Sequence, residues 1–324
     1  MAKESSGKNK GEASEIYANL IFITELKVDE IYFGNRIRMV LQDDDSYNLY
    51  NINTGIVVKN IKIIDLSKIR DELKKEILEN LNNKGSYHYK SIDKLMNILN
   101  CTKEDLTAPN HITVDTIAEF KNYSIKSSVG SYPAIFNYSQ STTHIYKIKD
   151  TDEFSEKMHE YKRKIKEKKM SKNDVLRELI QNDMIDLDGS KFVNKDFYNF
   201  LFNIDSSLPK IVMKLMYNKT KLKKTKLLDL LEEDDIKIFK KFLLLCTQGL
   251  VVGNFTTFKP IELYEFKLDK DLNYTITKYD EKYVDKMVYN IVVDRGSSSR
   301  TKFGEIKYHD GYWWFTDDIY LRYK

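Results

Sequence analysis

The stretch from Val114 to Lys126, VDTIAEFKNYSIK, decides the prediction of the fold. It belongs to a longer segment, Thr107 to Ile148, that is rich in β-branched and aromatic residues and is broken at Gly130 and Pro133. This composition is typical of strands joined by tight turns. Because side chains alternate between the two faces of an extended strand, we expect Ser124 and Lys126 on one face, with Asp115 at the end of the preceding strand.

Helical patterns flank this segment on both sides. Apolar residues recur at helical spacing over Glu12–Thr24, Lys68–Asn82 and Ile92–Leu99, whereas the short apolar run Ile61–Leu66 is typical of a strand. Strands dominate after Val251, and further helices are predicted over Phe154–Ile180, Phe192–Phe202, Leu208–Tyr217 and Asp235–Leu250. We therefore predict an α+β fold with a central mixed β-sheet flanked by helices, a helical middle segment and a β-rich C-terminal part.

No linker marks a sharp domain boundary in the chain. The length of 324 residues is enough for one large domain or two ordinary ones. We place a boundary near residue 150, which separates residues 1–150, with the N-terminal helix and the quoted stretch, from residues 151–324. A single compact unit is the alternative.

The composition excludes several classes of protein. Lys and Arg number 53 against 49 Asp and Glu, and this mild basicity is compatible with a polyanionic partner without requiring one. The two cysteines, Cys101 and Cys246, lie far apart, which argues for a reducing compartment and against a zinc module or a disulfide framework. No apolar run approaches the length of a membrane span, and the N-terminus lacks the apolar core of a secretory signal. We expect a cytoplasmic protein with no membrane partner.

Asp115 and Lys126 carry the chemistry that the quoted stretch indicates. A divalent cation held by hard oxygen ligands binds a phosphoryl oxygen and assists in forming hydroxide, and a lysine beside it orients the attacking water. Asp115 would be one ligand of Mg²⁺ and the main-chain carbonyl of Ile125 another. The structural alternative is that Asp115 ends a turn and Lys126 is a solvated strand residue.

Ser124 stands where such a site usually has a second carboxylate, so another segment must supply the acid. Glu119, in the quoted stretch, is one candidate, and Glu12 and Glu15 of the N-terminal helix are two more. We favour Glu15, since it adjoins Ile16 and is expected toward the core. Acids in a first helical turn also complement the helix dipole, which is the structural alternative.

Two polar segments carry side chains suited to hydrogen bonds with base edges and phosphates. Amides pair with adenine, Arg pairs with guanine, and hydroxyl groups bind several acceptors. The candidates for DNA contact are Asn137, Ser139, Gln140, Thr142, Arg295 and Arg300. Surface turns are the alternative interpretation of both segments, and the basic run Lys162–Lys169 would at most position a phosphate backbone.

Taken in order along the chain, these segments resemble the HpaII-type restriction endonucleases, nucleases with a variant of the PD-(D/E)XK motif. The resemblance covers four blocks, Lys10–Glu15, Tyr123–Gly130, Pro133–Ile148 and Ser297–Tyr323. It implies a type II enzyme that uses Mg²⁺ to cut double-stranded DNA at a short palindrome, CCGG-like, beside a cognate DNA methyltransferase that acts on the same site.

The resemblance also implies roles for single residues. Asp115 and Lys126 would be catalytic, with Glu15 as a further ligand, and four residues would lie at the DNA: Asn137, Ser139, Thr142 and Arg300. Tyr138 and the pair Thr143-His144 depart from the residues expected after Asn137 and Thr142, which leaves the recognised sequence open.

Two further questions stay open at this level. Since Ser124 replaces an acid, a non-catalytic, sequence-specific DNA-binding protein derived from a nuclease is the alternative function. A palindromic site favours a two-fold homodimer, and a monomer that nicks each strand in turn is the other possibility.

Overall fold

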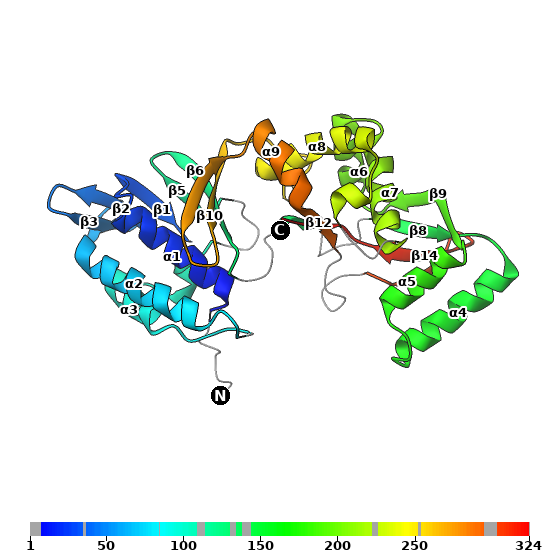
Figure 1. Cartoon of the computed structure of the whole chain (residues 1–324), viewed down its shortest axis with the longest axis horizontal. Coiled ribbons are helices and arrows are strands. Elements are labelled where there is room, and N and C mark those ends of the chain that lie inside the picture. Colours follow the sequence, from blue (N-terminus) through cyan, green and yellow to red (C-terminus); the bar gives the residue numbers. More distant parts are fainter. Residues whose placement is uncertain are drawn as a thin grey trace. The chain divides into compact units, whose positions relative to one another are not determined.

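The computed structural model describes residues 8–34, 37–83, 85–108, 114–129, 134–137, 144–221, 226–251, 254–294 and 303–323. The chain folds into two compact units (Figure 1). Unit 1 comprises Met1–Pro133 and Pro260–Tyr279, and unit 2 comprises Ala134–Lys259 and Asp280–Lys324. The chain therefore leaves unit 1 after residue 133 and later returns to it, whereas the sequence predicted a single boundary near residue 150.

Unit 1 is built on an eight-stranded mixed sheet with the strand order β11-β10-β6-β5-β1-β2-β3-β4. Its strands are β1 (Glu30–Phe33), β2 (Ile37–Gln42), β3 (Ser46–Tyr50), β4 (Val57–Lys62), β5 (Thr116–Ala118), β6 (Lys121–Ser127), β10 (Leu263–Leu268) and β11 (Tyr274–Lys278). Neighbouring strands pair antiparallel, except for β6 and β10, which run parallel. Parallel neighbours need a crossover connection, and here residues 134–259 of unit 2 form it.

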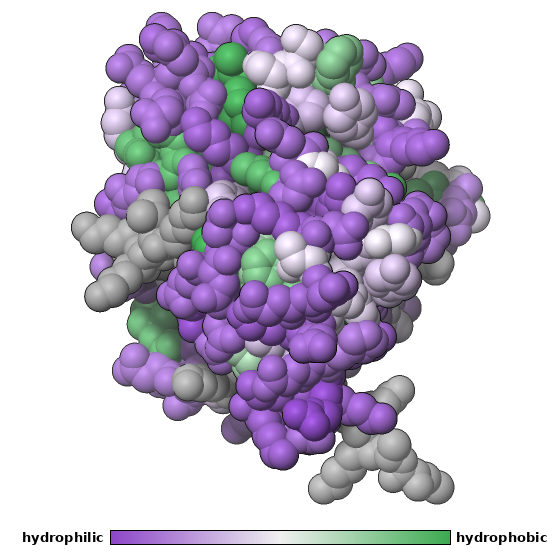
Figure 2. All heavy atoms as spheres, turned by 90° about the vertical axis from the view of Figure 1, so that its right-hand side faces the viewer, coloured by the Kyte–Doolittle hydropathy of each residue, from purple (hydrophilic) through white to green (hydrophobic). Residues whose placement is uncertain are grey.

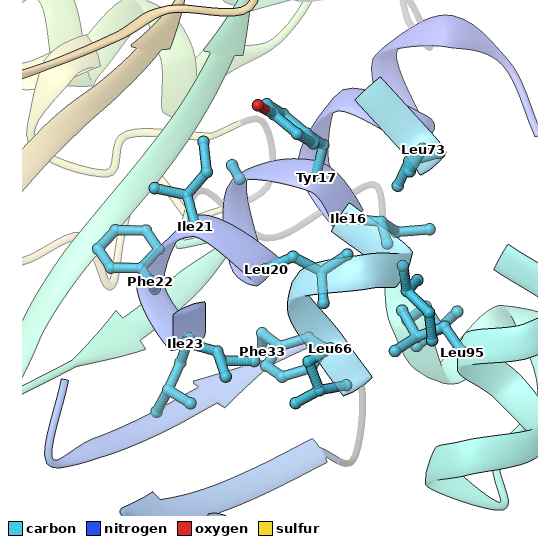
Figure 3. Close-up of a cluster of buried hydrophobic side chains, with 14 of the residues drawn as sticks. Ile16, Tyr17, Leu20, Ile21, Phe22, Ile23, Phe33, Leu66, Leu73 and Leu95 are labelled. Atoms are coloured by element: carbon cyan, nitrogen blue, oxygen red, sulfur yellow. The ribbon is translucent and has the colours of Figure 1, made fainter. Parts of the chain in front are cut away.

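Helix α1 (Lys10–Thr24) is the centre of the core of unit 1. A capping box of Asn9 and Glu12 starts it, and its side chains are buried on nearly every side. The other helices of unit 1 are α2 (Ile63–Glu79), α3 (Lys90–Leu99) and the 3-10 helix η1 (Lys103–Leu106). Figure 3 shows the apolar side chains of α1 among Leu66 and Leu73 of α2, Leu95 of α3 and Phe33 of β1.

The packing of α1 determines which face of β6 and β10 contacts this core. The ring centroid of Phe22 lies 4.8 Å from that of Tyr123 in β6 and 4.8 Å from that of Phe266 in β10. Because side chains alternate along a strand, Ser124 and Lys126 are directed to the opposite face of β6.

The described residues of unit 2 form two antiparallel sheets, with the strand orders β12-β15-β7 and β13-β14-β8-β9. The strands are β7 (Ala134–Asn137), β8 (His144–Ile148), β9 (Ile185–Phe192), β12 (Ile291–Asp294), β13 (Ile306–His309), β14 (Tyr312–Asp317) and β15 (Tyr320–Tyr323). The helices are α4 (Asp152–Lys166), α5 (Lys172–Gln181), α6 (Lys195–Ile204), α7 (Leu208–Lys221), α8 (Glu233–Thr247), α9 (Glu281–Met287) and the 3-10 helices η2 (Leu227–Asp229) and η3 (Val288–Asn290). Among the described residues of unit 2, the buried apolar side chains form two clusters, and Phe192 packs against both.

The face of unit 2 on which α4 and α5 lie is largely hydrophilic, with small, separated apolar spots (Figure 2). Much of the basic run Lys162–Lys169 is exposed on or just after α4. Within α4, Lys164 pairs with Glu160 at 2.7 Å, and Lys157 pairs with Glu153 at 2.9 Å. These ion pairs one helical turn apart are typical of a solvated helix face.

The structure confirms the α+β class, the central mixed sheet, the helical middle segment and the β-rich C-terminal part. The strand predicted over Ile61–Leu66 is confirmed only for Ile61 and Lys62, because β4 ends at Lys62 and the next residues start the buried stripe of α2. The helix predicted over Phe154–Ile180 is two helices, since the side chain of Ser171 accepts a hydrogen bond from the N–H of Asp174 and starts α5. Among the described helices, none is long and apolar enough to cross a membrane.

Candidate active site

The hairpin of β5 and β6 holds Asp115 beside the Ser124-Ile125-Lys126 segment. Thr116 is the register partner of Tyr123, and the N–H of Asp115 also donates to the carbonyl of Tyr123, at 2.9 Å. The Oδ2 atom of Asp115 then accepts hydrogen bonds from the N–H of Ile125 at 2.6 Å and from the hydroxyl of Ser124 at 3.3 Å. Ser124 therefore supports the carboxylate of Asp115 instead of supplying a second one.

Lys126 provides the positive charge for this carboxylate. Burial raises the pKa of Asp115 above its ordinary value, and the positive charge of Lys126 is the largest influence that opposes the rise. The hydrogen bonds from Ile125 and Ser124 lower the pKa of Asp115 further. The hairpin thus places Asp115, just before β5, near enough to Lys126 of β6 for the charge of Lys126 to lower its pKa.

Glu15 joins this pair from α1. Its Oε1 atom accepts a hydrogen bond from the N–H of Ala108 at 2.6 Å. Burial raises the pKa of Glu15 to about 8, and the negative charge of Asp115 is the second cause; the N–H of Ala108 and the charge of Lys8 oppose the rise. Where one carboxylate disfavours the ionisation of another, a bound cation or a proton retained by one of them relieves the repulsion.

The other two acids that were candidates to replace Ser124 have different surroundings. Glu12 belongs to the cap of α1, where its Oε2 atom accepts a hydrogen bond from the N–H of Asn9 at 2.8 Å. Glu119 is exposed at the turn of the hairpin, with φ of 47°, at the other end of β5 from Asp115. Of the three candidates, Glu15 is the one whose pKa the charge of Asp115 raises.

The sequence reasoning missed two residues of β10. In the parallel register of β6 and β10, Glu265 is the partner of Ser124, and Lys267 is the partner of Lys126. Glu265 is only 4% exposed. An acid-x-lysine pattern thus lies directly beside the serine-x-lysine pattern. A signal was present, since Glu265-Phe266-Lys267 lies after Val251, where strands are predicted to dominate, but no sequence pattern shows that this strand pairs with β6.

The candidate residues for DNA contact belong to unit 2. The backbone of Asn137 lies at the end of β7, where it is the register partner of Tyr320 in β15. The remaining five, Ser139, Gln140, Thr142, Arg295 and Arg300, lie outside the described residues. Asp115, Lys126, Glu15 and Ile125 all belong to unit 1.

The oxygen ligands at this site suit a cation that keeps several bound waters better than a cation held by protein atoms alone. Within the described part of the chain, no three His, Cys, Asp or Glu side chains are grouped so that they would hold a metal ion. Asp115 and Glu15 supply two carboxyl groups, and the carbonyl of Ile125 is a further hard oxygen. Mg²⁺ typically binds through one or two carboxylates and keeps several waters, so the pair meets its requirement.

No family model matches the chain, and no curated protein or solved structure matches it either.

Proposed function

We propose that the chain is a type II restriction endonuclease that hydrolyses phosphodiester bonds of double-stranded DNA with Mg²⁺. The observation that supports this most is the set of Asp115, Lys126 and Glu15. The positive charge of Lys126 lowers the pKa of Asp115, and the negative charge of Asp115 raises the pKa of Glu15. Two acids and a lysine are the groups that metal-assisted attack on a phosphodiester needs, and here Asp115 and Lys126 come from one β-hairpin and Glu15 from α1.

Each residue has a defined task in this proposal. Asp115 and Glu15 would hold Mg²⁺, with the carbonyl of Ile125 as a further ligand. When bound, the cation supplies positive charge at the phosphoryl oxygen and acidifies a bound water. Lys126 orients the attacking water and offsets the negative charge that develops on the phosphoryl oxygens. The water gives up a proton as its oxygen bonds to phosphorus, and the departing sugar oxygen takes one up.

The wider setting follows from the resemblance described above. The substrate would be a short palindrome, CCGG-like, and a cognate methyltransferase would modify the same site in the cytoplasm. The polar residues of unit 2, with Asn137 and Arg300 among them, would read the bases. A two-fold homodimer would match the symmetry of the palindrome.

Digestion of unmodified phage and plasmid DNA with Mg²⁺ tests this proposal. We expect discrete fragments, whose ends define the recognised sequence and the cut positions. Asp115→Asn and Lys126→Gln should lower the cleavage rate by more than about 100-fold while DNA binding persists. Lys121→Gln is the matched control, since Lys121 is exposed on the same strand. Uncut DNA across a broad panel, or a Lys126→Gln variant as active as the Lys121→Gln variant, would reject the proposal.

A non-catalytic DNA-binding protein is the second candidate function. The hydrogen bond from Ser124 to Asp115 favours it, because a hydroxyl donor occupies the place of a metal-binding acid. Such a protein would bind DNA equally well with Mg²⁺ or with a chelator. A titration of duplex DNA under both conditions separates the two functions.

A further inference from the structure

Unit 2 contains an open pocket of about 660 Å³ between the edge strand β9 and the helices α6 and α7. These three elements are labelled in Figure 1. The volume lies within the range of small-molecule sites in proteins. The pocket lies wholly within unit 2, and nothing in the proposed nuclease chemistry uses it.

The lining of this pocket is basic. Four lysines, Lys191, Lys195, Lys210 and Lys214, line it, against a single acid, Asp188. Lys214 is already held by Asp235 at 2.8 Å. Lys195 and Lys210 are exposed and have no ion-pair partner among the residues that the structure describes. Two exposed lysines in the lining without an ion-pair partner favour an anionic ligand and disfavour a cation.

The pocket also offers flat apolar surface. Phe192 and Tyr198 line it, with their ring centroids 5.9 Å apart, and Met213 is a further apolar neighbour. Tyr198 is 41% exposed and stacks on Phe202, which is 47% exposed, at a centroid distance of 6.0 Å. Exposed aromatic rings beside basic residues form the kind of platform on which nucleobases stack.

The cations and the rings together define the ligand. A simple anion such as phosphate would leave the aromatic surface unused, and a neutral apolar ligand would leave the lysines unused. A planar ring that carries a phosphate satisfies both. We propose that this pocket binds a nucleotide, with its base against Tyr198 and its phosphate at Lys195 and Lys210. This inference stands whether or not the chain cuts DNA.

The nucleotide can come from two sources, a free mononucleotide or the end of a single DNA strand. Calorimetric titration of the full chain with dAMP, and with a short 5′-phosphorylated single-stranded oligonucleotide, distinguishes them. If dAMP binds as tightly as the oligonucleotide, the pocket takes a free nucleotide; if the oligonucleotide binds at least about tenfold more tightly, the source is a DNA strand. Adenosine and inorganic phosphate, each with half of the recognised groups, should both bind at least about tenfold more weakly than dAMP.

Variants locate the binding in this pocket. Tyr198→Ala and the double variant Lys195→Gln with Lys210→Gln should each weaken nucleotide binding by about tenfold or more. The matched control is Lys162→Gln with Lys166→Gln, which removes the same charge from the exposed face of α4. Thermal unfolding checks that Tyr198→Ala still folds. Absence of nucleotide binding, equal losses in the pocket and control variants, or binding of adenosine as tight as that of dAMP would each overturn the inference.

Discussion

At the scale of single residues, the candidate site depends on how Glu15 and Asp115 share negative charge. Burial raises the pKa of both carboxyl groups. The charge of Lys126 and the N–H of Ile125 act in the opposite direction on Asp115, whereas the charge of Asp115 raises the pKa of Glu15. In the absence of a cation, a pKa of about 8 means that Glu15 retains a proton near neutral pH.

The proton on Glu15 predicts how stability depends on pH. The pKa of Glu15 is about 8 in the folded chain against an ordinary value of 4.5. Because the folded state binds this proton more tightly than the unfolded state, its stabilisation is complete below about pH 4.5 and is lost as the pH rises through 8. Glu15→Gln stays neutral, so it should raise the free energy of unfolding at pH 9 by on the order of 2–4 kcal/mol, with little change at pH 4.

Urea unfolding at pH 4, 7 and 9 in the presence of a chelator measures this effect. Asp115, whose pKa is raised as well, contributes a dependence of the same sign that persists in the variant. Glu119→Gln is the control, because Glu119 is exposed at the turn of the hairpin. Stability curves that run parallel for wild type and Glu15→Gln would show that the carboxyl of Glu15 ionises freely in the fold.

At the scale of elements, α1 builds the core and also positions the site. The Oδ1 atom of Asn19 accepts a hydrogen bond from the hydroxyl of Thr116 at 2.5 Å, and the hydroxyl groups of Ser14 and Ser127 are 3.1 Å apart. These bonds tie the helix that carries Glu15 to the hairpin that carries Asp115. The spacing of apolar residues predicted α1, but periodicity does not tell which polar side chains of a helix are buried. These hydrogen bonds therefore could not be predicted from the sequence.

Removal of one of these bonds tests their importance. Thr116→Val would leave the Oδ1 atom of the buried Asn19 without a donor, and the Nδ2 atom of Asn19 already lacks a hydrogen-bond partner among the described residues. The free energy of unfolding should fall by about 1–3 kcal/mol. Thr277→Val, at an exposed position of β11, should stay within about 0.5 kcal/mol of wild type. A Thr116→Val variant as stable as Thr277→Val would mean that packing alone holds α1 in place.

At the scale of the whole molecule, the sequence predicted most helices and strands, but it did not predict which strands pair in the sheet. Asp115 and Lys126 were found from the sequence because a two-residue turn joins their strands. Glu265 belongs to a strand that returns to the sheet only after residues 134–259, and no local pattern shows that β6 and β10 pair. The same limit explains why Glu12 and Glu119 stayed candidates beside the favoured Glu15, since the packing of α1 and the turn of the hairpin separate the three.

The parallel pairing of β6 and β10 leads to the last prediction, which concerns Glu265. A buried acid beside Ser124 is well placed to orient a cation-bound water from outside the set of direct ligands. Glu265→Gln should therefore lower the cleavage rate by about tenfold or more and raise the Mg²⁺ concentration needed for half-maximal rate. Glu262→Gln, just before the same strand and exposed, should change neither. If Glu265→Gln lowers the melting temperature but cuts DNA with an unchanged Mg²⁺ requirement, Glu265 serves the fold alone, and Asp115 and Glu15 carry the cation without it.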